Sequence, residues 1–214
     1  MARNFTAASS QSLEITSAPA TNVPLTMCAW FQVPDAADAN AFGGLVTLGT
    51  QNGIDRYSLF YRSGANNVAA IAVQGGTAGV ATTSTGPSSN TWAHACGVFT
   101  STTSRTAYID AGSSGTNTAS VTVGTPNNVV MAARYSTTLA SYLTGLIAEV
   151  GIWNAALTAD EIASLADGFT CDKVRPQSLV FYAPLVRNLQ DVKGGLTITN
   201  NNTATVANHP RVYA

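Results

Sequence analysis

The spacing of apolar residues changes from that of a strand to that of a helix within residues 143–165, LTGLIAEVGIWNAALTADEIASL. Strand alternation places Leu146, Ala148, Val150 and Ile152 on one face and Ile147, Glu149, Gly151 and Trp153 on the other. After this run, apolar residues recur at the spacing of one side of a helix, and Thr158 with Glu161 forms a capping box. The stretch therefore predicts a buried strand, a tight turn and one short α-helix near residues 158–166.

The rest of the chain consists mainly of short strand-like runs separated by turns rich in Gly, Asn and Ser. We expect one edge strand over residues 5–15, a turn over 111–116 followed by a strand at 119–123, and a polar loop over 135–142. This pattern is typical of an all-β, antiparallel β-sandwich of the jelly-roll kind. The length suits a single domain over residues 1–214, in which residues 191–214 form a C-terminal strand and tail.

Composition narrows the classes of partner. Charged residues make up only 10% of the chain and the net charge is −1, so we expect no contact with nucleic acid or a membrane surface. The three cysteines show neither a disulfide framework nor a metal-binding spacing, and we expect Cys28 and Cys96 to be buried free thiols. No apolar run has the length of a signal-peptide core or a membrane span, which predicts synthesis in a cytoplasm without a signal peptide.

Three segments resemble motifs of the laminin-G-like, concanavalin A-like lectin/glucanase superfamily. LTMCAWFQV is similar to its early strand, TWAHACGVFTSTTSRTAYID to its central hairpin, and GLIAEVGIWNAALTADEIASL to its closing strand and helix. The three segments occur in the family's order and span most of the chain, although Ala111 stands where the family usually has Gly. The resemblance implies a laminin-G-like domain with a concanavalin A-like sandwich fold.

The carboxylates argue against glycosidase chemistry on this scaffold. Retaining glycosidases need two carboxyl groups about 5 Å apart, and the related glucanases place them on one strand face. The corresponding strand here carries Glu149 alone, with Gly151 at the position of a second carboxylate. We therefore expect that the protein is not an enzyme. We interpret Glu149 as a structural carboxylate, with a calcium or sugar contact as the alternative, and His209 as an anchor of the chain terminus.

The resemblance also implies two kinds of binding site. Related sandwiches often bind calcium through loop oxygens, and the candidate ligands here are Asp35, Asp38, Asn40 and Asp110. No other cofactor is expected. Glycan sites in the family use aromatic rings that pack on sugar C–H groups, and the candidate rings are Tyr57, Tyr61, Tyr135 and Tyr142. The alternative for Tyr57 and Tyr61 is a half-buried position in a sheet.

The two ends of the chain carry a narrower resemblance. MARNFTAASSQSLEI, RPQSLVFYAPL and NHPRVYA resemble stand-alone laminin-G-like proteins encoded by tailed bacteriophages and prophages. This resemblance implies a non-enzymatic virion accessory protein, such as a head decoration or a fibre, that contacts the major capsid protein or another virion protein. Capsid symmetry favours a homo-oligomer such as a trimer. The alternative is a lectin-like glycan-binding module, on the virion or free.

Overall fold

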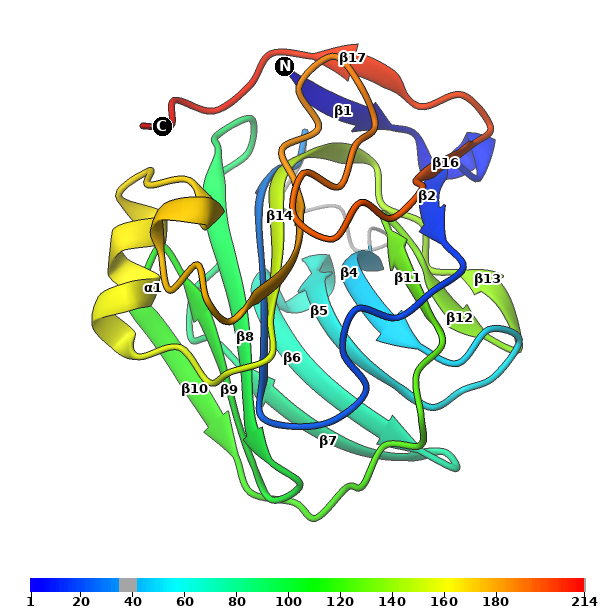
Figure 1. Cartoon of the computed structure of the whole chain (residues 1–214), viewed down its shortest axis with the longest axis vertical. Coiled ribbons are helices and arrows are strands. Elements are labelled where there is room, and N and C mark those ends of the chain that lie inside the picture. The colour runs from blue at the N-terminus through cyan, green and yellow to red at the C-terminus, as the bar shows by residue number, and fades with distance from the viewer. Residues whose placement is uncertain (35–41, 214) are drawn as a thin grey trace.

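The computed structural model describes residues 1–34 and 42–213, which form two antiparallel sheets packed face to face (Figure 1). In spatial order, the first sheet contains β10 (Ser113–Asn117), β9 (Ser104–Ile109), β8 (Ala93–Ser101), β3 (Leu25–Gln32), β14 (Gly145–Trp153), β1 (Ala2–Phe5) and β17 (Thr205–Ala207), with β15 (Leu179–Ala183) also beside β14. The second contains β16 (Thr199–Asn201), β2 (Ser12–Ile15), β11 (Asn128–Met131), β4 (Phe42–Gly49), β5 (Arg56–Arg62), β6 (Asn67–Gln74) and β7 (Thr77–Thr82). The predicted antiparallel β-sandwich is confirmed.

The main hydrophobic core fills the space between the two sheets. It combines alternate, inward-facing residues of both sheets, such as Phe31 from β3, Leu59 from β5 and Ile109 from β9. Burial of such side chains is the dominant favourable contribution to folding. Within the described residues, no helix is long and apolar enough to cross a bilayer.

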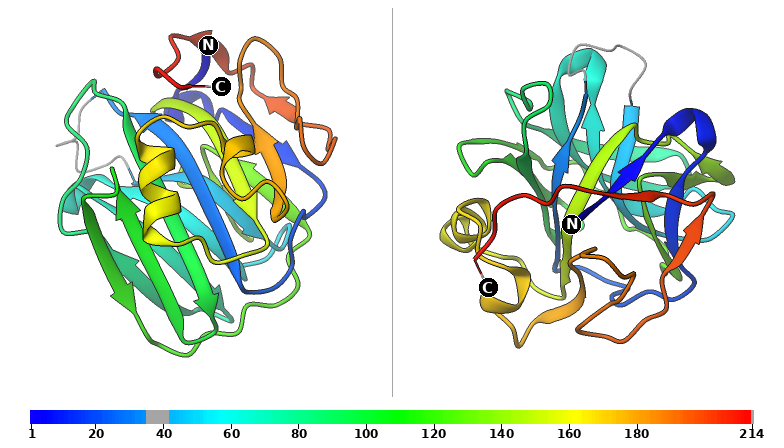
Figure 2. Two further views of the ribbon diagram at one scale, coloured as in Figure 1. Left: turned by 60° about the vertical axis from the view of Figure 1, so that its left-hand side comes forward. Right: turned by 90° about the horizontal axis from the view of Figure 1, so that it is seen from above.

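The helix α1 (Ala159–Ala166) lies over the outer face of the first sheet (Figure 2, left). A second, smaller apolar cluster joins residues of this helix to residues of that sheet. Thr158 Oγ1 accepts a hydrogen bond from the Glu161 amide at 3.3 Å, and the Glu161 carboxylate accepts from the Thr158 amide at 2.8 Å. The predicted helix and its capping box are thus confirmed. Ile162 and Leu165 turn toward the sheet and pack in the cluster that contains Trp153. The cluster therefore fixes the helix against the strand that precedes it.

Strand β14 contains a β-bulge that the alternating sequence pattern did not predict. Glu149 has a φ of +52°, and the register with β3 shifts between Ala148 and Gly151. As a result, Ile147 and Val150 both belong to the main core, whereas Trp153 faces the outer cluster. The predicted assignment of Ile147 and Val150 to opposite faces was wrong, because a bulge adds one residue to one side of the ladder.

The N-terminal segment crosses from one sheet to the other. Residues 5–15 do not form the single edge strand that was expected, because the short 3₁₀ helix η1 (Ala7–Ser9) separates β1 from β2. Strand β1 lies between β14 and β17 in the first sheet, and β2 lies between β16 and β11 in the second. Three residues of 3₁₀ helix are thus enough to carry the chain around the edge of the sandwich.

Several polar segments form strands because their backbone groups hydrogen-bond to a neighbouring strand. The expected turn over residues 111–116 contains most of β10, which pairs with β9, whereas residues 119–123 form no strand although Val121 and Val123 are buried. The expected loop over residues 135–142 contains most of the hairpin of β12 (Arg134–Ser136) and β13 (Thr138–Ala140). In the C-terminal tail, two short strands, β16 and β17, stand where one strand was expected.

Candidate functional site

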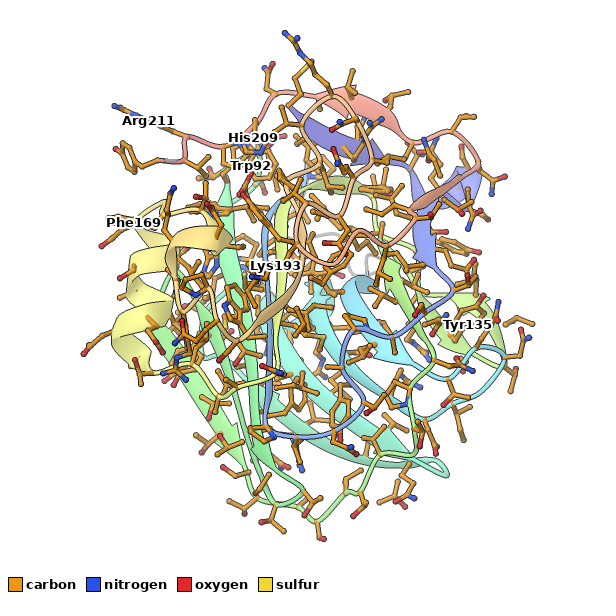
Figure 3. The ribbon with its side chains drawn as sticks, viewed as in Figure 1. Trp92, Tyr135, Phe169, Lys193, His209 and Arg211 are labelled. Atoms are coloured by element: carbon orange, nitrogen blue, oxygen red, sulfur yellow. The ribbon has the colours of Figure 1, made fainter. Side chains whose placement is uncertain are left out.

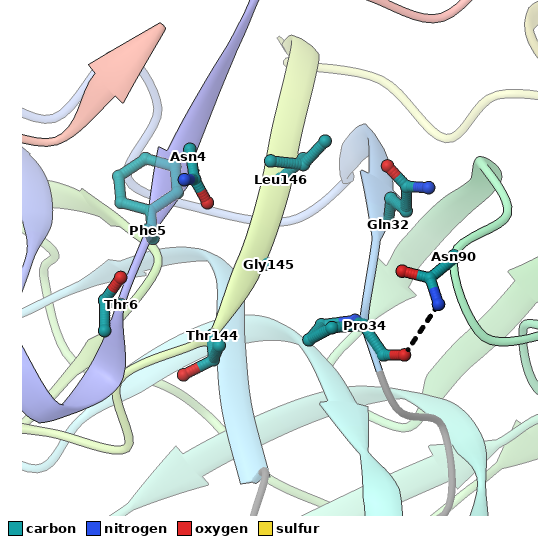
Figure 4. A pocket seen from close by; sticks show the side chains of 9 residues that line it. All are labelled: Asn4, Phe5, Thr6, Gln32, Pro34, Asn90, Thr144, Gly145 and Leu146. Carbon is teal, nitrogen blue, oxygen red and sulfur yellow. Dashed lines mark hydrogen bonds between the residues drawn. The ribbon is translucent and has the colours of Figure 1, made fainter. Parts of the chain in front are cut away.

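A pocket of about 200 Å³ opens at the outer face of the first sheet, where β14 begins (Figure 4). We call it the rim pocket. It is lined by nine residues from β1, β3, β14 and neighbouring segments: Asn4, Phe5, Thr6, Gln32, Pro34, Asn90, Thr144, Gly145 and Leu146. None of these side chains carries a formal charge. The rim pocket is smaller than the roughly 300–1,000 Å³ of sites for drug-sized molecules, so its size suits one small ring.

The centre of the rim pocket is a row of paired residues across three neighbouring strands. Asn4 of β1 pairs with Leu146 of β14, and Leu146 pairs with Gln32 of β3. Residues directly opposite one another in antiparallel strands point to the same face, so one aliphatic side chain lies between two amides, as Figure 4 shows. The side-chain amides of Asn4 and Gln32 make no hydrogen bond to another residue that the structure describes. Both amides are therefore available to a ligand.

Other contacts hold the edge of the rim pocket in place. The Asn90 side-chain amide donates to the Pro34 carbonyl at 3.0 Å (Figure 4), and Thr144 Oγ1 accepts from the Ala7 amide at 3.0 Å. Gly145 leaves room for this arrangement, because a Cβ there would lie 2.3 Å from the Gln32 carbonyl oxygen. A ligand would thus meet a preformed edge, which lowers the entropic cost of binding.

The structure places the four candidate tyrosines away from the rim pocket. Tyr57 is 3% exposed and Tyr61 is fully buried, and both rings belong to the main core. Their assignment as sugar-stacking rings was wrong, because they occupy inward-facing positions of β5. Tyr135 is buried on the outer face of the second sheet, with its hydroxyl donating to Glu14 Oε1 at 2.5 Å (Figure 3). Tyr142 is half-buried beside it.

The candidate calcium ligands are only partly described. Asp35, Asp38 and Asn40 lie outside the described residues. Asp110 is exposed, and its Oδ1 accepts a hydrogen bond from the His94 amide at 2.7 Å, which closes the open end of the β8–β9 hairpin. Over residues 1–34 and 42–213, no group of three or more His, Cys, Asp or Glu is arranged to hold a metal ion. Calcium binding by these residues stays a prediction.

Glu149 lies in a buried network with Tyr182 and His209. The carboxylate is 3% exposed; its Oε2 accepts from the Tyr182 hydroxyl at 2.5 Å, and its Oε1 lies 3.0 Å from His209 Nε2. Burial, reinforced by Glu149, raises the pKa of Tyr182, so the phenol stays protonated and donates. His209 belongs to the C-terminal tail (Figure 3), so the network ties this tail to the first sheet. Glu149 acts as a structural carboxylate here.

Gly151 could not be replaced by a second catalytic carboxylate. A Cβ at Gly151 would lie 2.6 Å from the Trp153 ring and 2.7 Å from Cys171 Sγ, which are closer than real Cβ contacts. The face of β14 on which related glucanases carry paired acids is therefore filled by an indole ring and a thiol. This packing gives a physical reason for the lone carboxylate in the sequence.

We expect the tail network to make stability depend on pH. Burial lowers the pKa of His209, but the hydrogen bonds to Glu149 and the Pro210 carbonyl outweigh burial and raise it above its ordinary value, against a small opposing effect of the N-terminal amine. A histidine whose pKa is raised on folding stabilises the folded state fully below its unfolded-state pKa of about 6.5. This stabilisation is lost as the pH rises through the folded-state pKa. The Tm difference between the wild type and His209→Asn should therefore shrink from pH 6 to pH 9.

A matched variant separates this effect from a general one. Glu149→Gln keeps His209 but removes the charge that it contacts, so the same pH-dependent difference should be lost. Parallel Tm-against-pH curves for the wild type and His209→Asn would contradict the assignment of the tail network.

Sequence reasoning did not identify the rim pocket. Asn4, Gln32 and Leu146 come from three distant parts of the chain and form no motif. The one local signal is Gln32, a polar residue near the end of the strongly apolar run LTMCAWFQV. Only the pairing of β1 and β3 on the two sides of β14 brings these residues into one row.

Three solved structures show the same fold at low sequence identity. The heptameric SAP-like pentraxin from Limulus polyphemus has a TM-score of 0.64 and 13% identity, over 93% of this chain and 89% of that chain. A candidate carbohydrate-binding protein from Bacteroides ovatus has a TM-score of 0.67 and 14% identity, over 97% and 61%. The CBM40 domain of the Ruminococcus gnavus IT-sialidase, bound to α2,3-sialyllactose, has a TM-score of 0.58 and 13% identity, over 69% and 84%. At these identities, the similarity shows the fold alone.

Sequence comparison supplies the family. No curated protein matches the chain. The sequence model of the concanavalin A-like lectin/glucanase superfamily matches residues 7–163, which include both sheets' central strands, the β14 bulge and the start of α1. The chain therefore belongs to the concanavalin A-like lectin/glucanase superfamily.

Proposed function

We propose that this protein is a non-catalytic, lectin-like module and that it binds a glycan in the rim pocket. The observation that carries the proposal is the row Asn4–Leu146–Gln32, in which two unengaged amides flank an aliphatic side chain. Amides hydrogen-bond well to sugar hydroxyls because they offer both donors and acceptors. An aliphatic side chain between them suits the C–H face of a sugar ring. The fold shared with carbohydrate-binding neighbours supports the same function.

The chemistry of the rim pocket favours a neutral sugar. Among the residues that the structure describes, no cationic side chain lines the rim pocket to pair with a carboxylate or sulfate, and no acidic side chain lines it to pair with an amine. A charged sugar would lose hydration without gaining an ion pair, which is unfavourable. We therefore expect binding to neutral mono- or oligosaccharides in preference to sialylated ones.

A glycan array followed by calorimetry tests this function. We expect the wild type to bind one or more neutral glycans, and we expect Gln32→Ala and Asn4→Ala each to weaken binding about five- to tenfold, because each removes a hydrogen bond worth roughly 1 kcal/mol. Gln74→Ala is the matched control, because Gln74 is an exposed amide at the end of β6 in the other sheet. Absence of binding to every glycan, or equal weakening by Gln74→Ala, would refute the proposal.

We propose as a second candidate that the module is a virion accessory protein attached through its chain ends. Six large hydrophobic side chains are exposed among the described residues: Met1, Phe169, Val186, Val192, Val206 and Tyr213. Met1, Val206 and Tyr213 belong to the terminal segments, and Phe169 pairs with Tyr213. The N- and C-terminal segments meet at one end of the sandwich (Figure 2, right). Exposed apolar residues near the chain ends are typical of protein contacts, and they support attachment to a partner protein.

Particle composition tests the second candidate. We expect purified phage particles to contain this protein in a fixed ratio to the major capsid protein, and Val206→Asp to reduce that ratio. Val206 is suited to the change because it is 47% exposed, so the substitution should leave folding intact. Particles that lack the protein would exclude this role without affecting the glycan test.

A further inference from the structure

A cluster of thiols lies on the outer face of the first sheet, beneath the segment that follows α1. Cys28 of β3, Cys96 of β8 and Cys171 of the 3₁₀ helix η3 (Cys171–Lys173) are all buried and reduced. Within the described chain, the cluster is not arranged to hold a metal ion. None of the three cysteines lines the rim pocket. Cys171 Sγ donates to the backbone carbonyl of Glu149 at 3.6 Å, so the thiols adjoin the Glu149 network without contacting its carboxylate.

Two of the thiols are nearly close enough to bond. Cys28 Sγ and Cys171 Sγ lie 3.9 Å apart, and the residues are 143 positions apart in the chain. A disulfide needs the sulfur atoms at about 2.05 Å, so a small rotation of both side chains would bring them together. Cys96 lies opposite Cys28 in the register of β3 and β8, but only Cys171 contacts Cys28 through sulfur.

The geometry points to a redox-dependent cross-link: we propose that Cys28 and Cys171 form a disulfide when the protein meets a mild oxidant such as a peroxide. The Cys28 thiolate attacks one oxygen of hydrogen peroxide, the O–O bond breaks, and a sulfenic acid forms. The departing hydroxide takes up the proton that Cys28 lost on ionising and leaves as one water. The Cys171 sulfur then attacks the sulfenic sulfur, the S–S bond forms, and a second water leaves with the Cys171 proton. Two thiols thus lose two electrons, and one peroxide is reduced to two waters.

The surroundings of the pair assign the order of these steps. Burial raises the pKa of Cys171, which favours its protonated form. Burial also opposes ionisation of Cys28, but the neighbouring Cys171 and His94 outweigh it and lower the pKa of Cys28. The thiolate is the reactive form of cysteine, so Cys28 is the attacking residue and Cys171 resolves the intermediate. A small neutral oxidant can enter when η3 opens locally, as short helices do.

The cross-link would tie the C-terminal part of the chain to the centre of the first sheet. Beyond η3 lie β15, β16, β17 and the tail that carries His209, which otherwise depend on non-covalent contacts. A disulfide stabilises by restricting the unfolded chain, and the restriction grows with the length of the closed loop. We therefore expect oxidation to raise the Tm of the full chain by roughly 10 °C.

Thiol counting and peptide mapping test the cross-link. The wild type should show three free thiols in denaturant before treatment with hydrogen peroxide and one afterwards, and a non-reduced digest should contain one peptide pair joined through Cys28 and Cys171. A reductant should reverse both changes and the rise in Tm. Cys96→Ser should behave like the wild type in peptide mapping and Tm, whereas Cys171→Ser should show no rise in Tm.

Three alternative results would overturn the proposal. These are three unreacted thiols after treatment, a peptide pair that contains Cys96, and sulfinic acid at Cys28 without a linked peptide. Each is read from the wild-type protein, so the test stands even if a variant fails to fold.

Discussion

Replacing Arg105 with alanine is expected to lower the free energy of unfolding by about 3–5 kcal/mol, which corresponds to a fall in Tm of about 10 °C. Arg105 is 1% exposed, and its guanidinium donates to Asn117 Oδ1 at 2.5 Å, to the Thr102 carbonyl at 2.7 Å and to the Ala119 carbonyl at 2.8 Å. Alanine would remove all three donated hydrogen bonds, would leave the Ala119 carbonyl without the guanidinium donor, and would open a cavity. Both changes are costly in a close-packed interior.

The position of Arg105 explains why one side chain matters this much. Its Nη1 lies against Gly79 of β7, so the guanidinium reaches from the first sheet to the second. It also holds residues 117–119, after which Val121 and Val123 cover the end of the main core. The wild type and Arg105→Ala should be compared by thermal unfolding, with near-UV circular dichroism to follow packing.

Two variants sharpen this comparison. Arg105→Lys keeps the charge, but a single ammonium cannot serve three acceptors in fixed directions, so we expect it to lose most of the same stability. Arg211→Ala removes an exposed arginine of the tail whose guanidinium lies over the Tyr213 ring, and we expect a change of less than about 1 kcal/mol. A loss for Arg105→Ala no larger than for Arg211→Ala would contradict the assigned role.

Replacing Trp153 with alanine is expected to cost about 3–5 kcal/mol, because it removes the largest fully buried side chain of the protein. The indole lies over Gly151, packs against Ile162 and Leu165 of α1, and donates from Nε1 to the Val174 carbonyl at 2.9 Å. Alanine would therefore loosen α1 and the segment around η3 together. In hydrogen-exchange measurements, Trp153→Ala should exchange faster than the wild type in residues 157–175, whereas β5 and β6 should exchange at nearly the same rate in both proteins.

Two further variants, Trp92→Ala and Trp153→Phe, provide the controls for this prediction. Trp92 is half-buried, directly precedes β8 and lies outside the outer cluster, so Trp92→Ala should cost clearly less than Trp153→Ala. Trp153→Phe keeps an aromatic ring but loses the bond to Val174, and we expect an intermediate loss. Equal losses for Trp92→Ala and Trp153→Ala would mean that the outer cluster does not hold α1 in place.

Parts of the candidate site could be read from the sequence and parts could not. The lone Glu149, two residues before Gly151, could be read from the sequence, because the spacing of carboxylates within one strand is a local feature. The tyrosines of β5 were misjudged, because alternation shows that Tyr57 and Tyr61 share a face but not which face is inside. The row of Asn4, Leu146 and Gln32 could not be predicted, because it depends on the order of strands from distant parts of the chain.

The sequence by itself determined the features that local chemistry controls. These are the all-β class, the capped helix at Thr158, and the family, whose motifs lie within continuous segments. Tertiary structure alone decided the features that need a partner strand. The polar residues of β10 and of the β12–β13 hairpin became strands because neighbouring backbone groups were free to pair with them. Likewise, the Glu149 bulge turned both Ile147 and Val150 inward, because the main core and the outer cluster each compete for the side chains of β14.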